Sequence, residues 1–172
     1  FVTSDKLVIG ICNGFQVLVK TGLLPDGRIG RQSVTLTAND SNRFEDRWVT
    51  LLAESSRSVF IEQGRYLYLP VAHAEGKFVP RDEKVLERLK QSGQVLFRYV
   101  TRDGGKPTYP ENPNGSIDDI AGICDTTGRI MGLMPHPERH IEPWHHPQWT
   151  RRGPATEGDG LQIFRNAVSY FR

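Results

Sequence analysis

The sequence predicts an α/β fold built on a doubly wound, mostly parallel sheet with a small antiparallel extension. Apolar runs of strand length alternate with segments of helical periodicity along most of the chain, which favours this class. The first apolar run, Lys6–Ile11, meets a cysteine between two glycines and then a helical pattern. Such a turn belongs at the carboxyl end of a central strand, where these sheets bind ligands.

The first half of the chain contains two predicted helices separated by strands. One helix is predicted over Asn13–Thr21, with Gly22 as its C-terminal stop. The other is predicted over Asp82–Gln91, with Val85, Leu86 and Leu89 on its inner face. Three short runs with strand-like composition lie between them, at Arg47–Leu52, Ser58–Ile61 and Tyr66–Val71.

The second half is predicted to end in a hairpin and a helix. A strand over Val95–Thr101 precedes a loop over Asp103–Ser116 that is rich in Gly, Pro and Asn. Ile120–Cys124 and Arg129–Met134 flank a turn sequence, which predicts an antiparallel hairpin. The last helix, Gly160–Phe171, is predicted to bury an apolar stripe formed by Leu161, Phe164, Ala167, Val168 and Phe171.

Composition narrows the class of protein. At 172 residues the chain has the length of one ordinary domain, and its formal net charge is +2. This balance gives no electrostatic surface for nucleic acid, and no apolar run reaches the length of a membrane span. Only two cysteines occur, which favours a reducing, cytoplasmic location over a disulfide framework.

Cys12 is the strongest candidate for chemistry. The pattern Gly10-x-Cys12-x-Gly14 between a strand and a helix is typical of a nucleophile elbow, with cysteine in place of serine. The glycines lack the β-carbons that would clash in the sharp turn, and the helix N-terminus is expected to favour the thiolate. A buried cysteine without a chemical role is the alternative that this pattern alone leaves open.

A histidine and a glutamate near the end of the chain complete the pattern. His136 and Glu138 are two residues apart, and Pro135 and Pro137 bracket the histidine. Prolines favour extended conformations in the residues before them, and residues i and i+2 of an extended chain point to the same side. We therefore expect Glu138 to hold one ring nitrogen of His136 while the other nitrogen faces a nucleophile.

Together these residues resemble the class I (triad) glutamine amidotransferases. The fixed positions of that family's nucleophile motif match Gly10, Cys12, Gly14 and Gln16, and residues 135–138 match its His/Glu motif. Longer strings are similar to the glutaminases of phosphoribosylformylglycinamidine synthases, at residues 10–18, 69–76, 112–123 and 132–139. Two parts of the chain depart from the pattern: Ala74, where many relatives carry glycine, and residues 140–158.

The resemblance implies a flavodoxin-like fold and a glutaminase reaction. Cys12 would attack the side-chain amide of L-glutamine, with His136 as base and Glu138 as the group that orients it. The ammonia would pass to an ATP-dependent synthetase subunit or domain that makes phosphoribosylformylglycinamidine in purine biosynthesis, with a small accessory subunit as a further partner. ATP and Mg²⁺ would be used by that synthetase, and the glutaminase step would need neither a cofactor nor a metal.

The same resemblance suggests roles for further residues. The Asn13 backbone N–H would supply one half of the oxyanion hole, and Gln16, His73 and Glu75 would bind the substrate. Members of this family have several βα units before the nucleophile strand, so residues 1–172 are expected to be the C-terminal portion of a single amidotransferase domain. Loss of one oxyanion-hole donor lowers rates by roughly 100- to 1,000-fold, which predicts weak or absent activity for this portion alone.

The sequence alone leaves other functions open. The chain could be another cysteine-elbow enzyme, either a different class I amidotransferase or a PfpI-like hydrolase, although the latter group lacks the Pro-His-Pro-Glu segment. It could also be a non-catalytic docking domain of a larger synthase.

The Pro-rich segment contains two tryptophans, Trp144 and Trp149. They are expected to contact a synthetase or a sister subunit.

Three weaker candidates have simpler explanations. A zinc site is suggested by three nearby histidines, but their spacing matches no known ligand pattern and favours a solvated loop: His140, His145 and His146. Arg98 could bind a carboxylate of a ligand, but a surface salt bridge is the default expectation. Cys124 lies within a predicted strand and is expected to be structural.

Overall fold

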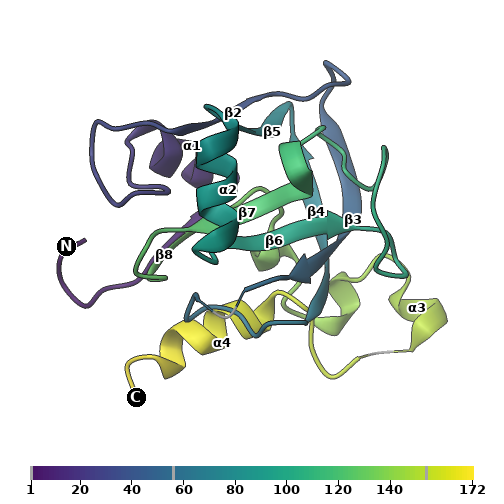
Figure 1. The fold of residues 1–172 in the computed structure, drawn as a ribbon. Helices are drawn as coiled ribbons and strands as arrows, with labels where there is room; N and C mark the ends of the chain where they lie inside the picture. Colours follow the sequence, from purple (N-terminus) through teal and green to yellow (C-terminus); the bar gives the residue numbers. More distant parts are fainter. Residues whose placement is uncertain (1, 56, 154) are drawn as a thin grey trace.

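The computed structural model describes residues 2–55, 57–153 and 155–172. Six strands form one sheet in the order β1-β8-β7-β6-β3-β4, and β2 pairs with β5 in a separate two-stranded sheet (Figure 1). The strands are β1 (Val8–Ile11), β2 (Val34–Ala38), β3 (Glu45–Ala53), β4 (Tyr66–His73), β5 (Glu75–Pro80), β6 (Val95–Val100), β7 (Ile120–Cys124) and β8 (Ile130–Leu133).

The described residues also form four α-helices and three 3-10 turns. The helices are α1 (Asn13–Lys20), α2 (Glu83–Gln91), α3 (Trp149–Arg152) and α4 (Leu161–Ser169). The 3-10 turns are η1 (Ile117–Asp119), η2 (Pro137–Arg139) and η3 (Pro143–His145). Among the described residues, no helix is both long enough and apolar enough to cross a lipid bilayer.

The sheet has a larger antiparallel part than the sequence predicted. β1 and β8 pair in parallel, whereas the β8–β7, β7–β6, β6–β3 and β3–β4 pairings are antiparallel. Of these antiparallel pairs, β7 and β8 are joined by a short hairpin turn, and strands joined in this way must run in opposite directions. The parallel pair is nevertheless the part of the sheet that leads to both candidate catalytic segments.

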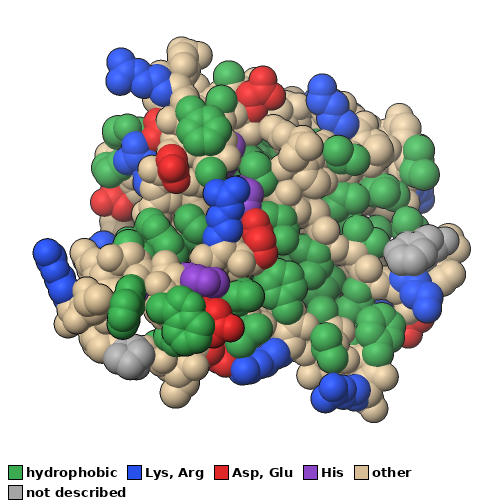
Figure 2. All heavy atoms as spheres, turned by 180° about the vertical axis from the view of Figure 1, so that it is seen from behind, with side chains coloured by type: hydrophobic (Ala, Val, Ile, Leu, Met, Phe, Trp, Pro, Cys, Tyr) green, Lys and Arg blue, Asp and Glu red, His purple; other side chains and the backbone are tan. Residues whose placement is uncertain are grey.

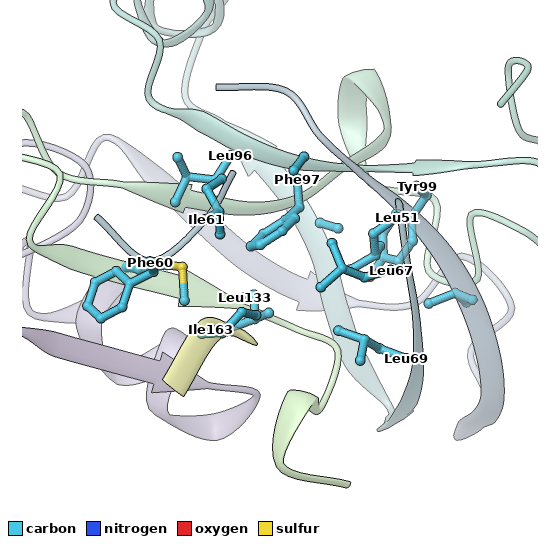
Figure 3. Packing of buried hydrophobic residues seen from close by; sticks show 14 of the residues in the cluster. Leu51, Phe60, Ile61, Leu67, Leu69, Leu96, Phe97, Tyr99, Leu133 and Ile163 are labelled. Atoms are coloured by element: carbon cyan, nitrogen blue, oxygen red, sulfur yellow. The ribbon is translucent and has the colours of Figure 1, made fainter. Parts of the chain in front are cut away.

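Side chains that alternate along the strands build a core on each face of the sheet. One cluster contains Leu96, Phe97 and Tyr99 from β6 and is closed by Ile163 of α4 (Figure 3). The other cluster packs β7 and β8 against Phe15 of α1 and against α2, together with β2 and β5. The molecule is therefore layered, with α1, α2 and the small sheet on one side and α4 on the other (Figure 1).

Most predicted elements are confirmed, but Ser58–Ile61 is not a strand. These residues form a turn, in which Ser58 Oγ donates to the Gly128 carbonyl at 3.0 Å. Phe60 is fully buried, so the apolar run fills the core from a turn rather than pairing in the sheet. Two strands were not predicted, β2 and β5.

The predicted apolar stripe on the last helix is wrong in its details. Ile163 is the fully buried residue of α4, whereas Val168 and Phe171 are 54% and 57% exposed. The Asn166 side chain donates to the Phe60 carbonyl at 3.0 Å, which turns the face carrying Ile163 toward the sheet. On the reverse side of the molecule, hydrophobic side chains gather over the half that carries β8 and the C-terminal helix (Figure 2).

Candidate active site

Cys12 lies in a strained turn between β1 and α1. Its backbone has φ 51° and ψ −106°, and its N–H donates to the Leu133 carbonyl at 2.9 Å. A positive φ is rare for a residue with a side chain and is typical of functional turns. A β-carbon on Gly10 would lie 2.8 Å from the backbone of Gly14, so the turn requires glycine at position 10. The same explanation is wrong for Gly14, where a β-carbon would meet no described atom within 4 Å.

The Cys12 thiol is half-buried and lies beside the end of β4. Its Sγ is 3.9 Å from the Ala72 carbonyl oxygen. Burial raises the pKa of this thiol, while the Asn13 backbone N–H and the Arg139 charge lower it and the Glu138 charge raises it. The predicted stabilisation of the thiolate by the helix N-terminus is therefore present but is outweighed by burial.

His136 and Glu138 meet as predicted, although a 3-10 turn brings them together instead of an extended chain. His136 Nδ1 is 2.6 Å from Glu138 Oε1, and a carboxylate can only accept, so Nδ1 carries the proton. His136 is 7% exposed, and its Nε2 is buried without a hydrogen-bond partner among the described residues. This nitrogen is consequently left with a lone pair that can accept a proton.

The sheet brings the two catalytic candidates to one place. β1 and β8 pair in parallel, with Gly10 opposite Gly132, so the segments that follow them leave the same edge of the sheet. Both segments contact the end of β4: the His136 N–H donates to the Pro70 carbonyl at 2.8 Å, and the Cys12 thiol faces Ala72. Cys12, His136 and Glu138 therefore converge on the carboxyl end of the parallel pair, as the sequence predicted.

Three further predicted residues line a shallow cavity of about 290 Å³ beside this site: Asn13, Gln16 and Glu75. Gln16 Nε2 donates to the Glu75 carbonyl oxygen at 2.8 Å, which ties the first turn of α1 to the start of β5. The Glu75 side chain is exposed, so its carboxylate faces the solvent next to the cavity. Polar groups from α1 and β5 therefore lie close to the turn that carries Cys12.

Comparison with known proteins decides the family. Residues 1–171 match the family described as CobB/CobQ-like glutamine amidotransferase domain. The chain belongs to this family. The amidotransferase identity that the Cys12 and His136 motifs predicted is thereby confirmed.

Individual relatives show which amidotransferases this domain is similar to. It is 49% identical to the phosphoribosylformylglycinamidine synthase subunit PurQ of Dehalococcoides mccartyi, over 100% of this chain and 66% of that protein. It is 43% identical to the PurQ subunit of Methanococcus maripaludis, over 99% of this chain and 68% of that protein. The chain thus spans about two thirds of the length of these relatives.

A solved structure confirms the fold class. The structure of PurLQS from Thermotoga maritima matches with a TM-score of 0.69 and 31% identity, over 96% of this chain and 62% of that chain. The predicted α/β glutaminase fold is therefore present, with the antiparallel share of the sheet described above.

His73 and Glu75, which the resemblance assigns to substrate binding, lie in different surroundings. His73 is 4% exposed and points into the domain, whereas Glu75 is exposed on the far side of the turn between β4 and β5. The His73 ring lies against Gly76, where an added β-carbon would be 2.4 Å from the ring carbon Cε1. A strand change at Ala74 breaks the i, i+2 relationship that would have placed both side chains together.

The buried His73 ring is held in its neutral form next to the catalytic candidates. Its Nδ1 lies 3.2 Å from Asn39 Oδ1, and its Nε2 has no hydrogen-bond partner among the described residues. Burial, and then the nearby charge of His136, lower the pKa of His73 to about 4. A neutral imidazole beside His136 adds no positive charge that would oppose protonation of His136.

The sequence analysis missed the residues that support His73. Asn39 also donates to the His73 carbonyl at 2.8 Å, and Asn114 donates to the Gly76 carbonyl at 2.9 Å and to the Tyr99 hydroxyl at 3.1 Å. Both asparagines are almost fully buried. A signal was available for Asn114, which lies in one of the strings that resemble the family, but nothing in the sequence marked Asn39.

The weaker candidates have structural roles. Arg98 forms ion pairs with Glu54 at 2.6 Å and with Asp118 at 2.7 Å, in agreement with the expected salt bridge. Cys124 is fully buried, and burial raises the pKa of its thiol to about 12. Trp144 and Trp149 are 59% and 44% exposed, which leaves them accessible to a partner.

Among the described residues, His140, His145 and His146 do not belong to a cluster of potential metal ligands. No group of three or more potential ligands occurs among the described residues. His140 is buried, in contrast to the expected solvated loop, and its Nδ1 is 2.7 Å from the Tyr68 carbonyl oxygen. It therefore fixes the segment to β4, whereas His145 is exposed.

Proposed function

We propose that this chain is the catalytic part of a glutaminase that supplies ammonia to a phosphoribosylformylglycinamidine synthase. One observation carries the proposal: His136 donates through Nδ1 to Glu138 and keeps a free, buried Nε2 beside a strained Cys12 elbow. A nucleophile, a base and a group that orients the base are the parts that acyl transfer requires.

In the first half of the proposed reaction, Cys12 forms a thioester with glutamine. His136 Nε2 takes the thiol proton as Sγ attacks the side-chain amide carbon, and the amide oxygen becomes an oxyanion. The Asn13 N–H, which lowers the pKa of the Cys12 thiol, is suited to stabilise that oxyanion. The carbon–nitrogen bond then breaks, and His136 returns its proton to the departing ammonia.

In the second half, water releases glutamate. His136 accepts a proton from water, which attacks the thioester carbon through a second oxyanion. The carbon–sulfur bond breaks, and the proton passes from His136 to the Cys12 thiolate. Glu138 keeps the imidazole in one tautomer throughout and stabilises its positive charge. We propose that Gln16 and Glu75 bind the amino-acid end of glutamine, with His73 supporting this side of the site from within.

The raised pKa of Cys12 fits this assignment of roles. A thiol whose pKa lies above its ordinary value is protonated at neutral pH, so it needs a base to become a nucleophile. The Nε2 of His136, which has no hydrogen-bond partner among the described residues, is placed to take that proton. Activation would therefore occur in the substrate complex, and a resting thiol would be protected from unwanted reactions.

The acceptor and the partners are proposed from the relatives. Those relatives are named phosphoribosylformylglycinamidine synthase subunits, and the PurLQS structure is named as an assembly of more than one component. We propose that the ammonia reaches an ATP- and Mg²⁺-dependent synthetase, with a small accessory subunit in the complex. The glutaminase step itself would use no cofactor. Its setting would be the cytoplasm, where two free cysteines persist in reduced form.

The deciding experiment measures glutamine-dependent ammonia release by the full-length protein together with its synthetase. Native protein is compared with Cys12→Ala and with the matched control Cys124→Ala, which removes the buried structural thiol. Release is expected to need Cys12, to persist in the control, and to rise with formylglycinamide ribonucleotide and ATP.

Other outcomes separate the alternatives. Release that needs Cys12 but ignores the ribonucleotide and ATP would retain the glutaminase and refute this acceptor. No release from native protein that still binds the synthetase would favour a non-catalytic docking domain. Reaction of Cys12 with substrates other than glutamine would point to a different cysteine hydrolase.

A further inference from the structure

A cavity outside the candidate active site lies at the free edge of β4. It has a volume of about 500 Å³, within the range of roughly 300–1,000 Å³ typical of small-molecule sites. Its lining combines cationic, aromatic and acidic side chains, notably Arg102, Arg152, Tyr68, Trp149, His146 and Asp159. We call it the edge cavity. The helix α3, which carries Trp149 and Arg152, lies at the lower right of Figure 1.

The two arginines of the edge cavity have no carboxylate partner among the described residues. Arg102 contacts the Tyr68 hydroxyl at 3.3 Å and lies over the Tyr68 ring, 5.5 Å from its centroid. Arg152 lies 2.9 Å from His146 Nε2. Both arginines are exposed, in contrast to the half-buried Arg98, which is paired with Glu54. Two uncompensated guanidinium groups facing one cavity are suited to a phosphate group.

The electrostatics of the cavity agree with an anionic ligand. The pKa of His146 is lowered by partial burial and then by the positive charges of Arg152, His140 and Arg102, with Asp159 opposing them. His146 is therefore neutral at physiological pH and can accept a hydrogen bond from Arg152. Among the charges that act on this ring, the cations Arg152 and Arg102 are opposed by the Asp159 carboxylate.

Aromatic rings supply the other half of the recognition surface. Tyr68 stacks on Trp48 with centroids 5.2 Å apart, and His146 lies 5.3 Å from Tyr68, so this part of the wall is rigid. Trp149 lines the cavity, is 44% exposed, and has no aromatic partner among the described residues. An exposed indole face next to two arginines can stack on a planar ring.

We propose that the edge cavity binds a nucleoside phosphate. Arg102 and Arg152 hold the phosphate, Trp149 stacks on the base, and Oδ1 of Asp159 accepts from a sugar hydroxyl. The other oxygen of Asp159 already accepts from the Tyr68 N–H at 2.7 Å, which fixes its position. The two arginines, the Trp149 ring and the Asp159 carboxylate thus match the phosphate, the base and the sugar of such a ligand.

The cavity is connected to the catalytic candidates through β4 and the segment after Glu138. His140 lines the cavity and is held to the Tyr68 carbonyl, two residues beyond Glu138 in the chain. Farther along β4, Pro70 and Ala72 contact His136 and Cys12. A ligand in the edge cavity would therefore contact the same strand that supports the catalytic groups.

The test is a titration of the full-length protein with AMP, followed by calorimetry and by tryptophan fluorescence. Adenosine, ribose 5-phosphate and inorganic phosphate serve as partial ligands. AMP is expected to bind more tightly than any of them, because only AMP presents both a ring and a phosphate on a sugar. Fluorescence should change because Trp149 lines the cavity.

Variants identify the site. Arg102→Gln and Arg152→Gln are each expected to weaken AMP binding by about tenfold or more, since each removes a charge-assisted contact. Arg151→Gln is the matched control, because Arg151 is exposed on the same short helix and does not line the cavity. Circular dichroism and the unfolding midpoint report whether each variant is folded.

Three results would overturn the proposal, and none depends on the glutaminase assignment. AMP could fail to bind at millimolar concentration. AMP could bind equally well to folded variants lacking either arginine. Finally, AMP could bind to no form of the protein while the arginine variants weaken association with the synthetase. That result would make the edge cavity a protein contact.

Discussion

At Cys12 two effects of opposite sign act on one thiol. The helix N-terminus and Arg139 favour the thiolate, while burial and Glu138 favour the neutral thiol, and the net effect raises the pKa. The strained φ of 51° holds Sγ at the end of β4 regardless of its protonation state. The backbone therefore sets the position of the thiol, and in the proposed reaction its reactivity depends on His136 as the base.

His73 makes the stability of the domain depend on pH. Its pKa is about 4 in the folded protein against 6.5 for the ordinary side chain, so the unfolded chain binds a proton first as the pH falls. Folding stability is then lost between pH 6.5 and pH 4, and the loss between pH 7 and pH 5 is about 2 kcal/mol from this residue.

The measurement is urea unfolding of the full-length protein at both pH values. His73→Gln is expected to remove most of this pH dependence, even where its stability at pH 7 is lower. The matched control His145→Gln changes an exposed histidine and should keep the native dependence. An unchanged dependence in His73→Gln would show that other groups are responsible.

At the scale of elements, the strand-to-helix turn contains two glycines that look equivalent in the sequence but have different steric surroundings. A β-carbon on Gly10 would lie 2.5 Å from the Leu18 side chain and 2.8 Å from the backbone of Gly14. Gly10→Ala is expected to lower the free energy of unfolding by about 1–3 kcal/mol through overpacking. Gly14→Ala is expected to leave it unchanged or raise it by up to about 1 kcal/mol, since alanine suits a helix better.

Chemical denaturation of both variants tests this contrast. Cys12 alkylation by iodoacetamide checks that the elbow is intact in Gly14→Ala. Equal destabilisation by the two substitutions would mean that the turn needs glycine at both positions, as the sequence pattern implied.

Local patterns predicted the elements whose own residues determine them. The helix α2 has a capping residue, since Asp82 accepts from the Val85 N–H at 2.9 Å, and an inner face at helical spacing. β7 and β8 flank a turn and form the expected hairpin. β2 and β5 could not be found in this way, because each is defined by pairing with the other across a long separation in sequence.

The candidate site was predicted to a similar extent. Cys12, His136 and Glu138 are marked by glycine and proline patterns that act locally, so sequence reasoning could find them. The orientation of His73 depends on a strand change at Ala74 and on close packing against Gly76, which no local pattern reveals. The edge cavity was missed for the same reason, since it joins β4, α3 and the residues before α4.

At the scale of the whole molecule, α4 closes one face of the sheet through a single buried residue. Ile163 is 1% exposed within the core cluster that contains Phe60 and Leu133, whereas Val168 is 54% exposed. Ile163→Ala is expected to lower the free energy of unfolding by about 2–5 kcal/mol, because it leaves a cavity in the core. Val168→Ala should change it by less than about 0.5 kcal/mol.

Urea unfolding of the full-length protein compares these two substitutions. They remove aliphatic groups from the same helix, which makes each a control for the other. A larger effect of Val168→Ala would indicate that the predicted apolar stripe, rather than Ile163, faces a buried surface.

The parallel pairing of β1 with β8 also bears on how such a protein can change over evolutionary time. Cys12 and His136 are far apart in the sequence, yet their strands are neighbours at a spacing of about 4.8 Å, with Gly10 opposite Gly132. The geometry of the reacting groups is thus independent of how many residues lie between them. Loops in that interval can gain or lose residues, and so acquire new contacts, while the chemistry is inherited unchanged.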